Sequence, residues 1–301
     1  MGYIEVCRYR DVLLKVPEEY HFSFTNSPYY AHLNFKAIDV YPPIGDDELI
    51  SPFDGKLIFY RKLHDEHICG FKLNQVYVRI LHVKPLIKVG EYVRLGDILG
   101  KLQYSPTFRP WTDYHAHIEI RLKDEFIRAR GGQELTIGKD ILSRLKGSSW
   151  HHSVINEDRK IIGYIHLVKQ GKYILIKPKH CEEKYLTPIM VRVDDQDHIG
   201  FLEGGIPYYG HGGILINSAH IKPGDKVKLL DHTLAYVNKV YEGYLHIIPF
   251  KTSFFVENII LKGISLYVNF KYIKVIPRQW ENIGLREGDE VELTIGGAFS
   301  D

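Results

Sequence analysis

Apolar and polar residues alternate one for one over residues 114–121. The apolar positions are Ala116, Ile118 and Ile120, and the polar positions are His115, His117, Glu119 and Arg121. A period of two is typical of a β-strand, because successive side chains point to opposite faces. The pattern predicts a half-buried strand that carries both histidines and Glu119 on one face.

A shared face brings two chemical possibilities to the two histidines. They can converge on one metal ion, or one can bind it while the other transfers protons. Glu119 is placed to orient an imidazole from behind. The alternative is the polar outer face of an ordinary sheet, and a His-x-His spacing alone does not decide between these interpretations.

Short apolar runs bounded by glycine or proline predict further strands along the chain. They fall at residues 35–41, 76–83, 174–176, 189–193 and 213–216. Aromatic residues make up 13% of the chain, including 21 tyrosines, which suits β structure. Helical spacing occurs over residues 136–145, with Gly147 as a stop signal. The chain is therefore predicted to be mainly β.

Two glycine-containing patterns predict turns. Residues 221–229 and 285–293 both read apolar-x-x-Gly-Asp-x-Val-x-Leu, and residues 89–93 are related to them. We expect a glycine with positive φ and an adjacent carboxylate, rather than a duplicated domain. Residues 203–213 contain five glycines, two tyrosines and a histidine. A long flexible hairpin loop is favoured there over a backbone cradle for a ligand, because phosphate-loop spacing is missing.

Composition narrows the classes of partner and compartment. The 301 residues suffice for two or three domains, and the net charge is only +2, without a basic stripe. Nucleic acid and membrane are therefore not expected as partners. Three cysteines without a C-x-x-C spacing indicate neither a disulfide framework nor a thiolate zinc site. No signal-peptide core or long apolar run occurs, so we expect a cytoplasmic protein.

Six elements spread over roughly residues 30–125 occur in an order that is similar to one peptidase family. They are His32, Asp39, the Ser51-Pro52-Phe53-Asp54-Gly55 turn, Leu81-His82, the run with Gly90, Val93, Gly96 and Gly100, and His115-Ala116-His117. This order resembles the lysostaphin/LytM-like zinc metallopeptidases. Their fold is β-rich and of the duplicated-hybrid-motif kind, which the resemblance implies for this region, as a barrel or sandwich.

The resemblance also implies roles for five residues. His32, Asp39 and His117 would bind zinc, and His82 and His115 would flank the zinc-bound water, stabilising an oxyanion or moving protons. Three protein ligands with a position left for water are what a catalytic zinc requires. The implied activity is hydrolysis of a peptide bond in a small or flexible peptide, through a water activated by the metal.

This chain departs from the family pattern in three respects. Phe35 stands four residues before Asp39, where the commonest form has its first histidine, and His32 lies seven residues before it. The alternative for His32 is a surface-loop histidine. Residues 106–113 replace a glycine-rich loop with a bulkier one that contains two prolines. Family members mainly cut cell-wall peptides outside the cytoplasm, which puts the substrate of this chain in question.

The predicted organisation has three parts. Residues 1–130 form the metallopeptidase-like module, residues 131–153 a helix and linker, and residues 154–301 one or two small β-barrel-like domains. The alternative function is a non-hydrolytic metal-binding or scaffold module whose C-terminal β domains bind a protein or glycan. A biotinyl-type domain is disfavoured, because no target lysine stands at a convincing turn. Deleting residues 150–301 is expected to leave zinc binding intact.

Overall fold

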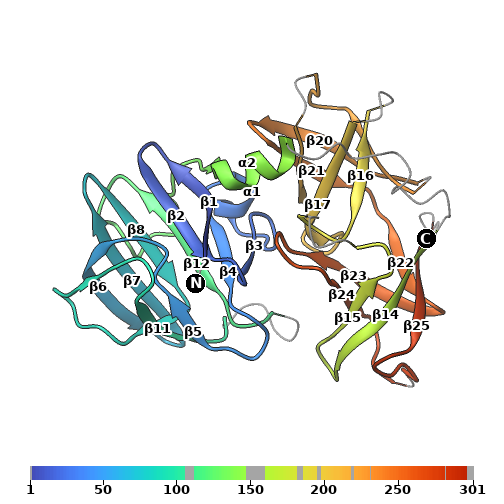
Figure 1. Ribbon diagram of the computed structural model, residues 1–301, viewed down its shortest axis with the longest axis horizontal. Coiled ribbons are helices and arrows are strands. Elements are labelled where there is room, and N and C mark those ends of the chain that lie inside the picture. Colours follow the sequence, from blue (N-terminus) through green and yellow to red (C-terminus); the bar gives the residue numbers. More distant parts are fainter. Residues whose placement is uncertain are drawn as a thin grey trace. The chain divides into compact units, whose positions relative to one another are not determined.

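A computed structural model describes residues 2–105, 112–146, 160–181, 186–194, 198–217, 220–230, 232–281 and 283–296 (Figure 1). The chain divides into two compact units. The first unit contains Met1–Phe24 and Tyr29–Ser143, and the second contains Thr25–Pro28 and Arg144–Asp301. Two predicted parts lie largely outside the described residues: the linker that ends the predicted 131–153 segment, and the loop at 106–113. Within the described chain, no helix is long and apolar enough to cross a membrane.

Both units are built almost wholly from strands, as the sequence predicts. The strands of the first unit are β1 (Tyr3–Tyr9), β2 (Val12–Pro17), β3 (His21–Ser23), β4 (Ile38–Tyr41), β5 (Glu48–Ile50), β6 (Gly55–Leu63), β7 (Glu66–Leu73), β8 (Val76–Leu81), β9 (Val83–Pro85), β10 (Tyr92–Val93), β11 (Ile98–Leu102), β12 (Ala116–Arg121) and β13 (Thr136–Ile137). Among the described residues, the helices are the short α1 (Tyr30–Leu33) and α2 (Lys139–Lys146), and the division between the units falls within α2.

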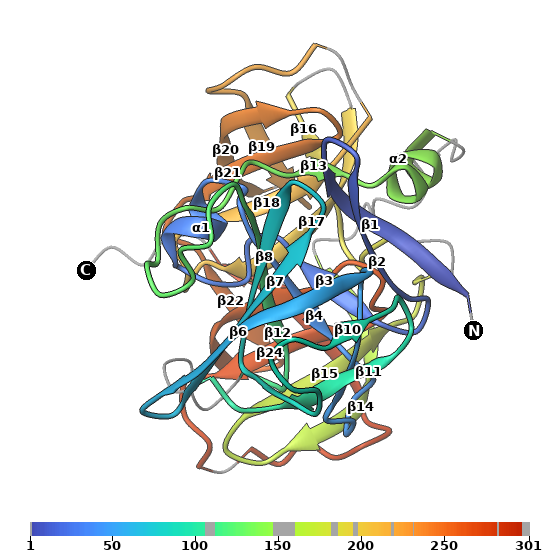
Figure 2. The same cartoon turned by 90° about the vertical axis from the view of Figure 1, so that its left-hand side faces the viewer.

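A seven-stranded antiparallel sheet dominates the first unit, in the order β10-β6-β7-β8-β12-β4-β3 (Figure 2). The β7–β8 hairpin turns through two residues, of which Asn74 has φ +48°, a value that asparagine tolerates and tight hairpins need. Two three-stranded sheets, β13-β1-β2 and β5-β11-β9, complete the unit. Strand β12 lies between β8 and β4 and brings its own polar residues to the centre of the large sheet.

The strand predicted at 114–121 is observed as β12, which begins only at Ala116, so His115 lies just before it. The strand is also not half-buried. All six of its residues are buried, including the charged ones. Its polar face is covered because Arg79, on β8, and backbone carbonyls of residues 125 and 128 contact it. Alternation of apolar and polar residues predicts which side chains share a face of a strand. It does not predict whether the polar face is covered by other parts of the chain.

Three predicted elements differ at their ends from the observed ones. The strand expected at 76–83 divides into β8 and β9, because His82 between them has φ +66°. The strand expected at 35–41 begins only at Ile38, since Phe35 has φ +52° in the preceding turn. The helix expected at 136–145 begins at Lys139, because Thr136 and Ile137 pair with β1 as strand β13.

In the described part of the second unit, twelve strands form two closed rings (Figure 1, yellow-green to red). They are β14 (Lys160–Lys169), β15 (Tyr173–Pro178), β16 (Met190–Val193), β17 (His198–Ile206), β18 (Gly212–Leu215), β19 (Lys226–Leu229), β20 (His232–Tyr241), β21 (Tyr244–Pro249), β22 (Ser253–Val256), β23 (Ile259–Leu266), β24 (Ile273–Pro277) and β25 (Glu290–Gly296). The first ring runs β16-β19-β20-β21-β18-β17 and closes through β16–β17, and the second runs β23-β22-β25-β14-β15-β24 and closes through β23–β24.

The two rings share one apolar core and one strand pairing. Leu202 and Val237 of the first ring and Ile264 and Val275 of the second belong to the same buried cluster. The rings join where β17 pairs with β23. Because each sheet closes on itself, neither ring leaves an open strand edge, and the predicted small barrels are confirmed as an architecture.

The repeated Gly-Asp pattern forms the turn that the sequence predicts. Gly224 and Gly288 have φ +96° and +91°. The carboxylate of Asp225 accepts a hydrogen bond of 2.8 Å from the amide of Lys222, and Asp289 accepts one of 2.7 Å from the amide of Arg286. Only glycine adopts such a φ without strain, and aspartate satisfies a turn amide. The two turns lead into β19 and β25.

The glycine-rich stretch at 203–213 is not the flexible loop that we favoured. Most of it belongs to β17 and β18, and residues 203–206 and 211–213 are buried. Glycine is needed there for close approach: a Cβ on Gly212 would lie 2.9 Å from the side chain of Ile206, and one on Gly204 would lie 2.5 Å from Thr25 Oγ1. The glycines therefore serve packing between segments of the second unit.

Candidate metal centre

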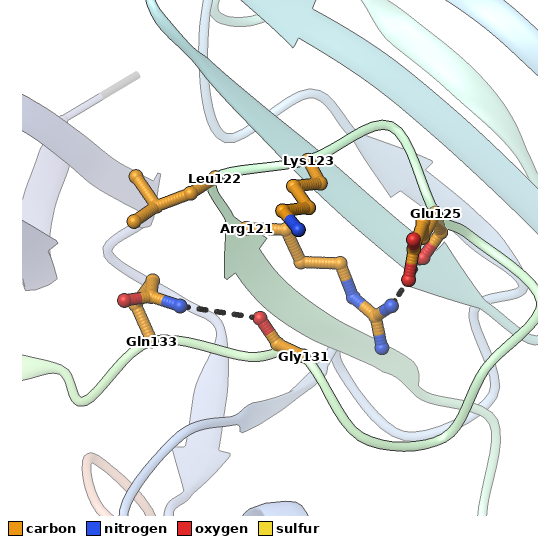
Figure 3. A pocket seen from close by; sticks show the side chains of 6 residues that line it. All are labelled: Arg121, Leu122, Lys123, Glu125, Gly131 and Gln133. Carbon is orange, nitrogen blue, oxygen red and sulfur yellow. Dashed lines mark hydrogen bonds between the residues drawn. The ribbon is translucent and has the colours of Figure 1, made fainter.

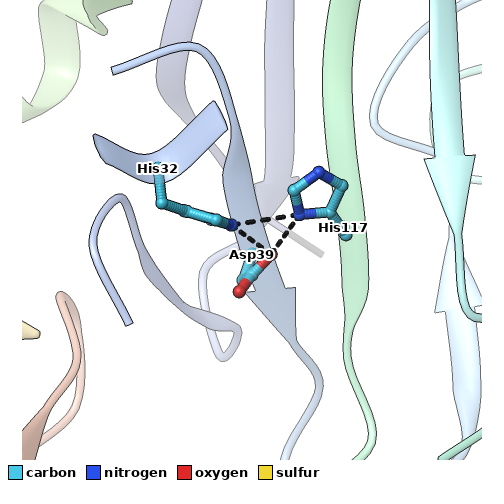
Figure 4. A group of neighbouring side chains, drawn as sticks. All are labelled: His32, Asp39 and His117. Carbon is cyan, nitrogen blue, oxygen red and sulfur yellow. Dashed lines mark hydrogen bonds and ion pairs between the residues drawn. The ribbon is translucent and has the colours of Figure 1, made fainter. Parts of the chain in front are cut away.

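Three elements of the first unit bring His32, Asp39 and His117 together (Figure 4). His32 lies on the single turn of α1, Asp39 on β4, and His117 on β12. Asp39 and His117 are direct partners in the antiparallel pairing of β4 with β12. Side chains of directly paired residues stand on the same face, so the register itself places the carboxylate beside the imidazole.

The three side chains meet through one atom each. His32 Nε2 lies 3.1 Å from Asp39 Oδ1 and 3.0 Å from His117 Nδ1, and His117 Nδ1 lies 2.9 Å from Asp39 Oδ1. The residues are 0%, 2% and 4% exposed. The alternative of a surface-loop histidine is thus wrong for His32, which is wholly buried although it precedes the strand by several residues.

Each of the two imidazoles makes a hydrogen bond through the nitrogen that points away from Asp39. These bonds determine that the other nitrogen of each ring carries the lone pair. His32 Nδ1 lies 2.7 Å from the carbonyl oxygen of Phe24, and His117 Nε2 lies 3.0 Å from Glu119 Oε1. Carbonyl and carboxylate oxygens only accept hydrogen bonds, so both of these nitrogens carry a hydrogen. In the neutral rings, His32 Nε2 and His117 Nδ1 therefore point lone pairs at each other and at Asp39.

Three converging lone pairs require a cation between them, either a proton or a metal ion. Burial opposes a charge on His117, but hydrogen bonds to Asp39 and Glu119 outweigh it and raise the pKa of His117 to about 9. Burial also opposes the charge of Asp39, but the nearby His32 and His115 and the bond to His117 hold its pKa well below the usual value of 3.8. A metal ion would compete with a proton for His117 Nδ1.

The donor set fits a zinc ion. Two imidazole nitrogens and a carboxylate oxygen form a common set of three protein ligands for a catalytic zinc. Bonds of about 2.0–2.2 Å in a tetrahedron separate neighbouring ligand atoms by about 3.4 Å. The distances of 2.9 to 3.1 Å fall short of this by only a few tenths of an ångström, so small outward shifts would admit the ion.

Glu119 backs His117, as the strand pattern predicts, and is itself held by two arginines. Its Oε1 accepts 3.0 Å bonds from His117 Nε2 and from Arg79 Nη1, and its Oε2 accepts bonds of 3.1 and 2.6 Å from Arg121. Burial would raise the pKa of Glu119, but His117 and the two arginines lower it to about 2. The carboxylate therefore stays ionised and keeps the hydrogen on His117 Nε2.

Arg121 is in turn held by the chain that follows β12 (Figure 3). Its guanidinium donates to the backbone carbonyl of Glu125 and, over 2.8 Å, to that of Arg128. A Cβ on Gly131 would lie 3.0 Å from this guanidinium, so glycine lets the chain pass closely over it. A pocket of about 260 Å³ lies here, lined by Arg121, Leu122, Lys123, Glu125, Gly131 and Gln133. This segment buries the ion pairs behind the metal centre.

The other two predicted residues, His82 and His115, lie next to the three converging side chains. His115 Nε2 is 4.0 Å from Asp39 Oδ2, and the rings of His115 and His82 have centroids 4.8 Å apart. His115 Nδ1 lies 2.9 Å from the carbonyl oxygen of Asp113, so it carries a hydrogen and the lone pair is on Nε2. Burial, with the charges of nearby histidines, lowers the pKa of His115 to about 4 despite Asp39, and the ring is therefore neutral at pH 7.

Two neighbours of this pair were missed from the sequence. They are Glu66 and Tyr41. Glu66 lies on β7, and its Oε1 is 3.0 Å from His82 Nδ1. Tyr41 stacks on His115 with ring centroids 5.1 Å apart. Tyr41 follows Asp39 by two on β4, so the period-two rule would have found it. The position of Glu66 depends on a long-range pairing, β7 with β8, for which the sequence carries no local signal.

Comparison with known proteins adds little to this geometry. A family described as the N-terminal domain of DUF8155, a domain of unknown function, matches residues 12–137. No curated protein matches the chain. Among solved structures, the antimicrobial peptidase lysostaphin from Staphylococcus simulans is 15% identical, with a TM-score of 0.29 over 77% of this chain and 88% of that chain. An NMR solution structure of lysostaphin is 17% identical, with the same TM-score and coverage.

Proposed function

We propose that the first unit is a zinc-dependent hydrolase that cleaves a peptide bond in a small or flexible peptide. The observation that carries the proposal is the convergence of three buried ligand atoms within 3.1 Å, with the orientation of both imidazoles fixed from behind. The order of the six motifs in the sequence, from His32 to the His-x-His pair, supports the same reaction class.

In this proposal, His32, Asp39 and His117 hold the metal. A bound zinc supplies Lewis-acid chemistry, lowering the pKa of water towards about 7 and polarising a carbonyl group. The hydrogen bonds that the two imidazoles donate to the Phe24 carbonyl and to Glu119 keep both rings aimed at one point. Ligands held in this way lose little freedom on binding, which raises metal affinity.

His115 and His82 would handle protons beside the metal. The lone pair on His115 Nε2 faces the same side as Asp39 Oδ2, so a neutral His115 can accept a proton from the attacking water. The returned proton would go to the leaving amine of the peptide. Glu66 lies against His82 and would orient that ring beside the developing oxyanion.

Burial of the five side chains supports the proposed class of substrate. His32, Asp39, His82, His115 and His117 are all at most 5% exposed. An extended, flexible peptide can thread to such a site, whereas a folded protein presents its backbone only after local unfolding. We therefore expect short or glycine-containing peptides to be cleaved in preference to folded proteins.

The test begins with elemental analysis of protein purified without a chelator, followed by digestion of a library of unstructured peptides. We expect about one zinc per chain, loss of the metal in His32→Ala, and hydrolysis that a chelator abolishes and zinc restores. His64→Ala, on the exposed hairpin tip, is the control. Bound metal without hydrolysis of any peptide would favour the alternative, a metal-binding module whose C-terminal β region binds a protein or glycan.

A further inference from the structure

Residues 25–28 leave the first unit and belong to the second, while the chain on either side of them stays in the first. Thr25, Asn26 and Ser27 are only 0%, 7% and 3% exposed, although all three are polar. Buried polar groups are nearly always hydrogen-bonded. Side chains of the second unit make such bonds to all three residues, so the segment is built into that unit.

Two adjacent residues of β17, Glu203 and Gly204, form the position that Thr25 occupies. Thr25 Oγ1 donates a hydrogen bond of 2.9 Å to Oε1 of Glu203, which is fully buried. The next residue, Gly204, has φ +104°, and a Cβ there would lie 2.5 Å from Thr25 Oγ1. Tyr244 donates a further bond to the same carboxylate oxygen. A carboxylate buried beside a glycine thus provides both the acceptor and the space that Thr25 needs.

Ser27 is held by a chain of buried side chains from the first ring. His211 Nε2 donates a bond of 2.7 Å to the carbonyl oxygen of Ser27. His211 Nδ1 then accepts from His246 Nε2 over 3.1 Å, and His246 Nδ1 accepts from Asn238 over 3.1 Å. Every hydrogen in this chain has a direction fixed by the Ser27 carbonyl. The Ser27 carbonyl is therefore the final acceptor of this chain of hydrogen bonds.

Asn26 reaches the second ring. Ser265, on β23, donates a bond of 3.4 Å to Asn26 Oδ1, and Tyr208 contacts the Ser265 hydroxyl. Ser265 pairs with Gly205 of β17, at the point where the two rings join. The segment thus binds at the junction of the rings, with contacts to both.

The position of this segment also affects His32. The carbonyl of Phe24, which accepts from His32 Nδ1, and the amide of Thr25 belong to one planar peptide group. Fixing Thr25 therefore fixes the direction of that carbonyl. At the other end, Tyr29 follows the segment directly, and its carbonyl accepts bonds of 3.0 and 3.1 Å from the amides of His32 and Leu33.

We propose that the second unit is a receptor for the chain's own residues 25–28, and that their docking positions His32 for metal binding. The second part rests on the metal centre proposed above. The ligand is an extended polar peptide, recognised through a threonine hydroxyl, an asparagine side chain and a serine carbonyl. The second unit then controls metal affinity without supplying a ligand atom.

The test compares Thr25→Glu with Thr25→Ser in the full chain. A carboxylate at position 25 would face the buried Glu203, whereas serine keeps the hydroxyl. Two measurements are made: hydrogen exchange at the amides of His32 and Leu33, and affinity for Co²⁺ and Zn²⁺ by competition with a coloured chelator. We expect Thr25→Glu to speed exchange and weaken metal binding by about tenfold or more, because only the docked fraction binds well. Thr25→Ser should match the natural chain in both.

Further variants separate docking from general instability. Val191→Ala removes buried volume from β16, a strand that contains none of Glu203, His211 and Ser265, so it should lower the melting temperature but leave metal affinity unchanged. If the glutamate variant does not fold, Thr25→Val replaces it, because valine lacks the hydroxyl that donates to Glu203. If Thr25→Glu or Thr25→Val shows faster hydrogen exchange but unchanged metal affinity, the proposal that docking positions His32 is overturned. If no protein binds metal, the proposed function fails, and equal exchange at His32 in all variants would then overturn the docking as well.

Discussion

His117 Nε2 lies 3.0 Å from Glu119 Oε1, and the other nitrogen of the same ring faces Asp39 and His32. One carboxylate therefore fixes the orientation of an imidazole whose opposite side faces the candidate metal position. Both residues stand on the same face of β12, so a two-residue spacing on one strand provides a candidate ligand and its support.

Glu119→Gln should weaken metal binding by about 10- to 100-fold, because it removes the charge that supports His117. It also leaves buried Arg79 and Arg121 without their carboxylate, and breaking such buried pairs typically costs about 3–5 kcal/mol of stability. Chelator competition and urea unfolding measure the two effects. Glu125→Gln is the control, since its carboxylate is half-exposed and lies 3.6 Å from Arg128. Unchanged metal affinity in Glu119→Gln would contradict a supporting role.

Metal affinity should rise with pH. Below its pKa of about 9, His117 must release a proton before Nδ1 can bind a metal ion. The apparent affinity should therefore increase by about tenfold per pH unit through neutral pH and level off above pH 9. Titration calorimetry in buffers of different ionisation enthalpy measures the released proton. Binding that does not change between pH 6.5 and 9 would show that His117 is not a ligand.

Stability of the metal-free chain should follow the opposite trend at high pH. A pKa of His117 raised from 6.5 to about 9 adds stability that is complete below pH 6.5 and lost as pH rises through 9. A pKa of Glu119 lowered from 4.5 to about 2 adds stability that is present above pH 4.5 and lost as pH falls through 2. The pKa of His115, lowered from 6.5 to about 4, removes stability as pH falls from 6.5 towards 4. Urea unfolding with chelator present should thus show the greatest stability near pH 6.5. Stability that keeps rising above pH 7 would contradict these assignments.

His82→Ala and His115→Ala should reduce peptide hydrolysis by about 10²- to 10⁴-fold, the usual contribution of general acid–base catalysis. Zinc content should stay near one per chain, because neither residue belongs to the three converging ligands. His67→Ala is a matched control, since His67 is buried nearby and bonds to Tyr60 instead of facing the centre. Loss of zinc in either of the first two variants would show that ligand and proton-transfer roles had been exchanged.

The sequence predicted the parts of the centre that depend on local pattern. Alternation on β12 placed His117 and Glu119 on one face, and both lie there. The Gly-Asp pattern predicted the turns before β19 and β25, because positive φ and a capping carboxylate are properties of the turn residues themselves. His32 came from motif order, and its place on a short helix was not foreseen.

The features that the sequence did not predict depend on contacts between residues that are far apart in the chain. Gly204 leaves the space that Thr25 occupies, and no local rule connects two positions so far apart in the chain. For the same reason we expected zinc binding to survive deletion of residues 150–301. That deletion would remove Glu203, His211 and Ser265, the partners of residues 25–27. Metal affinity should therefore fall in the truncated chain if docking controls His32.

Gly204→Ala should disturb docking more than Gly210→Ala, which is its matched control. Both glycines have positive φ, +104° and +74°, so alanine introduces backbone strain of about 1–2 kcal/mol at either position. Only at Gly204 would the added Cβ also meet Thr25 Oγ1, at 2.5 Å, whereas nothing lies within 4 Å of a Cβ at Gly210. Overpacking of this kind adds about 1–3 kcal/mol.

The difference between these two variants isolates the contact with Thr25. Urea unfolding should show the larger loss of stability for Gly204→Ala, and hydrogen exchange should quicken from Thr25 to Leu33 in that variant alone. Chelator competition should show weaker zinc binding in Gly204→Ala and natural affinity in Gly210→Ala, since only the former displaces the peptide group whose carbonyl holds His32 Nδ1. Equal exchange and equal zinc affinity in the two variants would mean that the close approach of Gly204 to Thr25 plays no part in positioning His32.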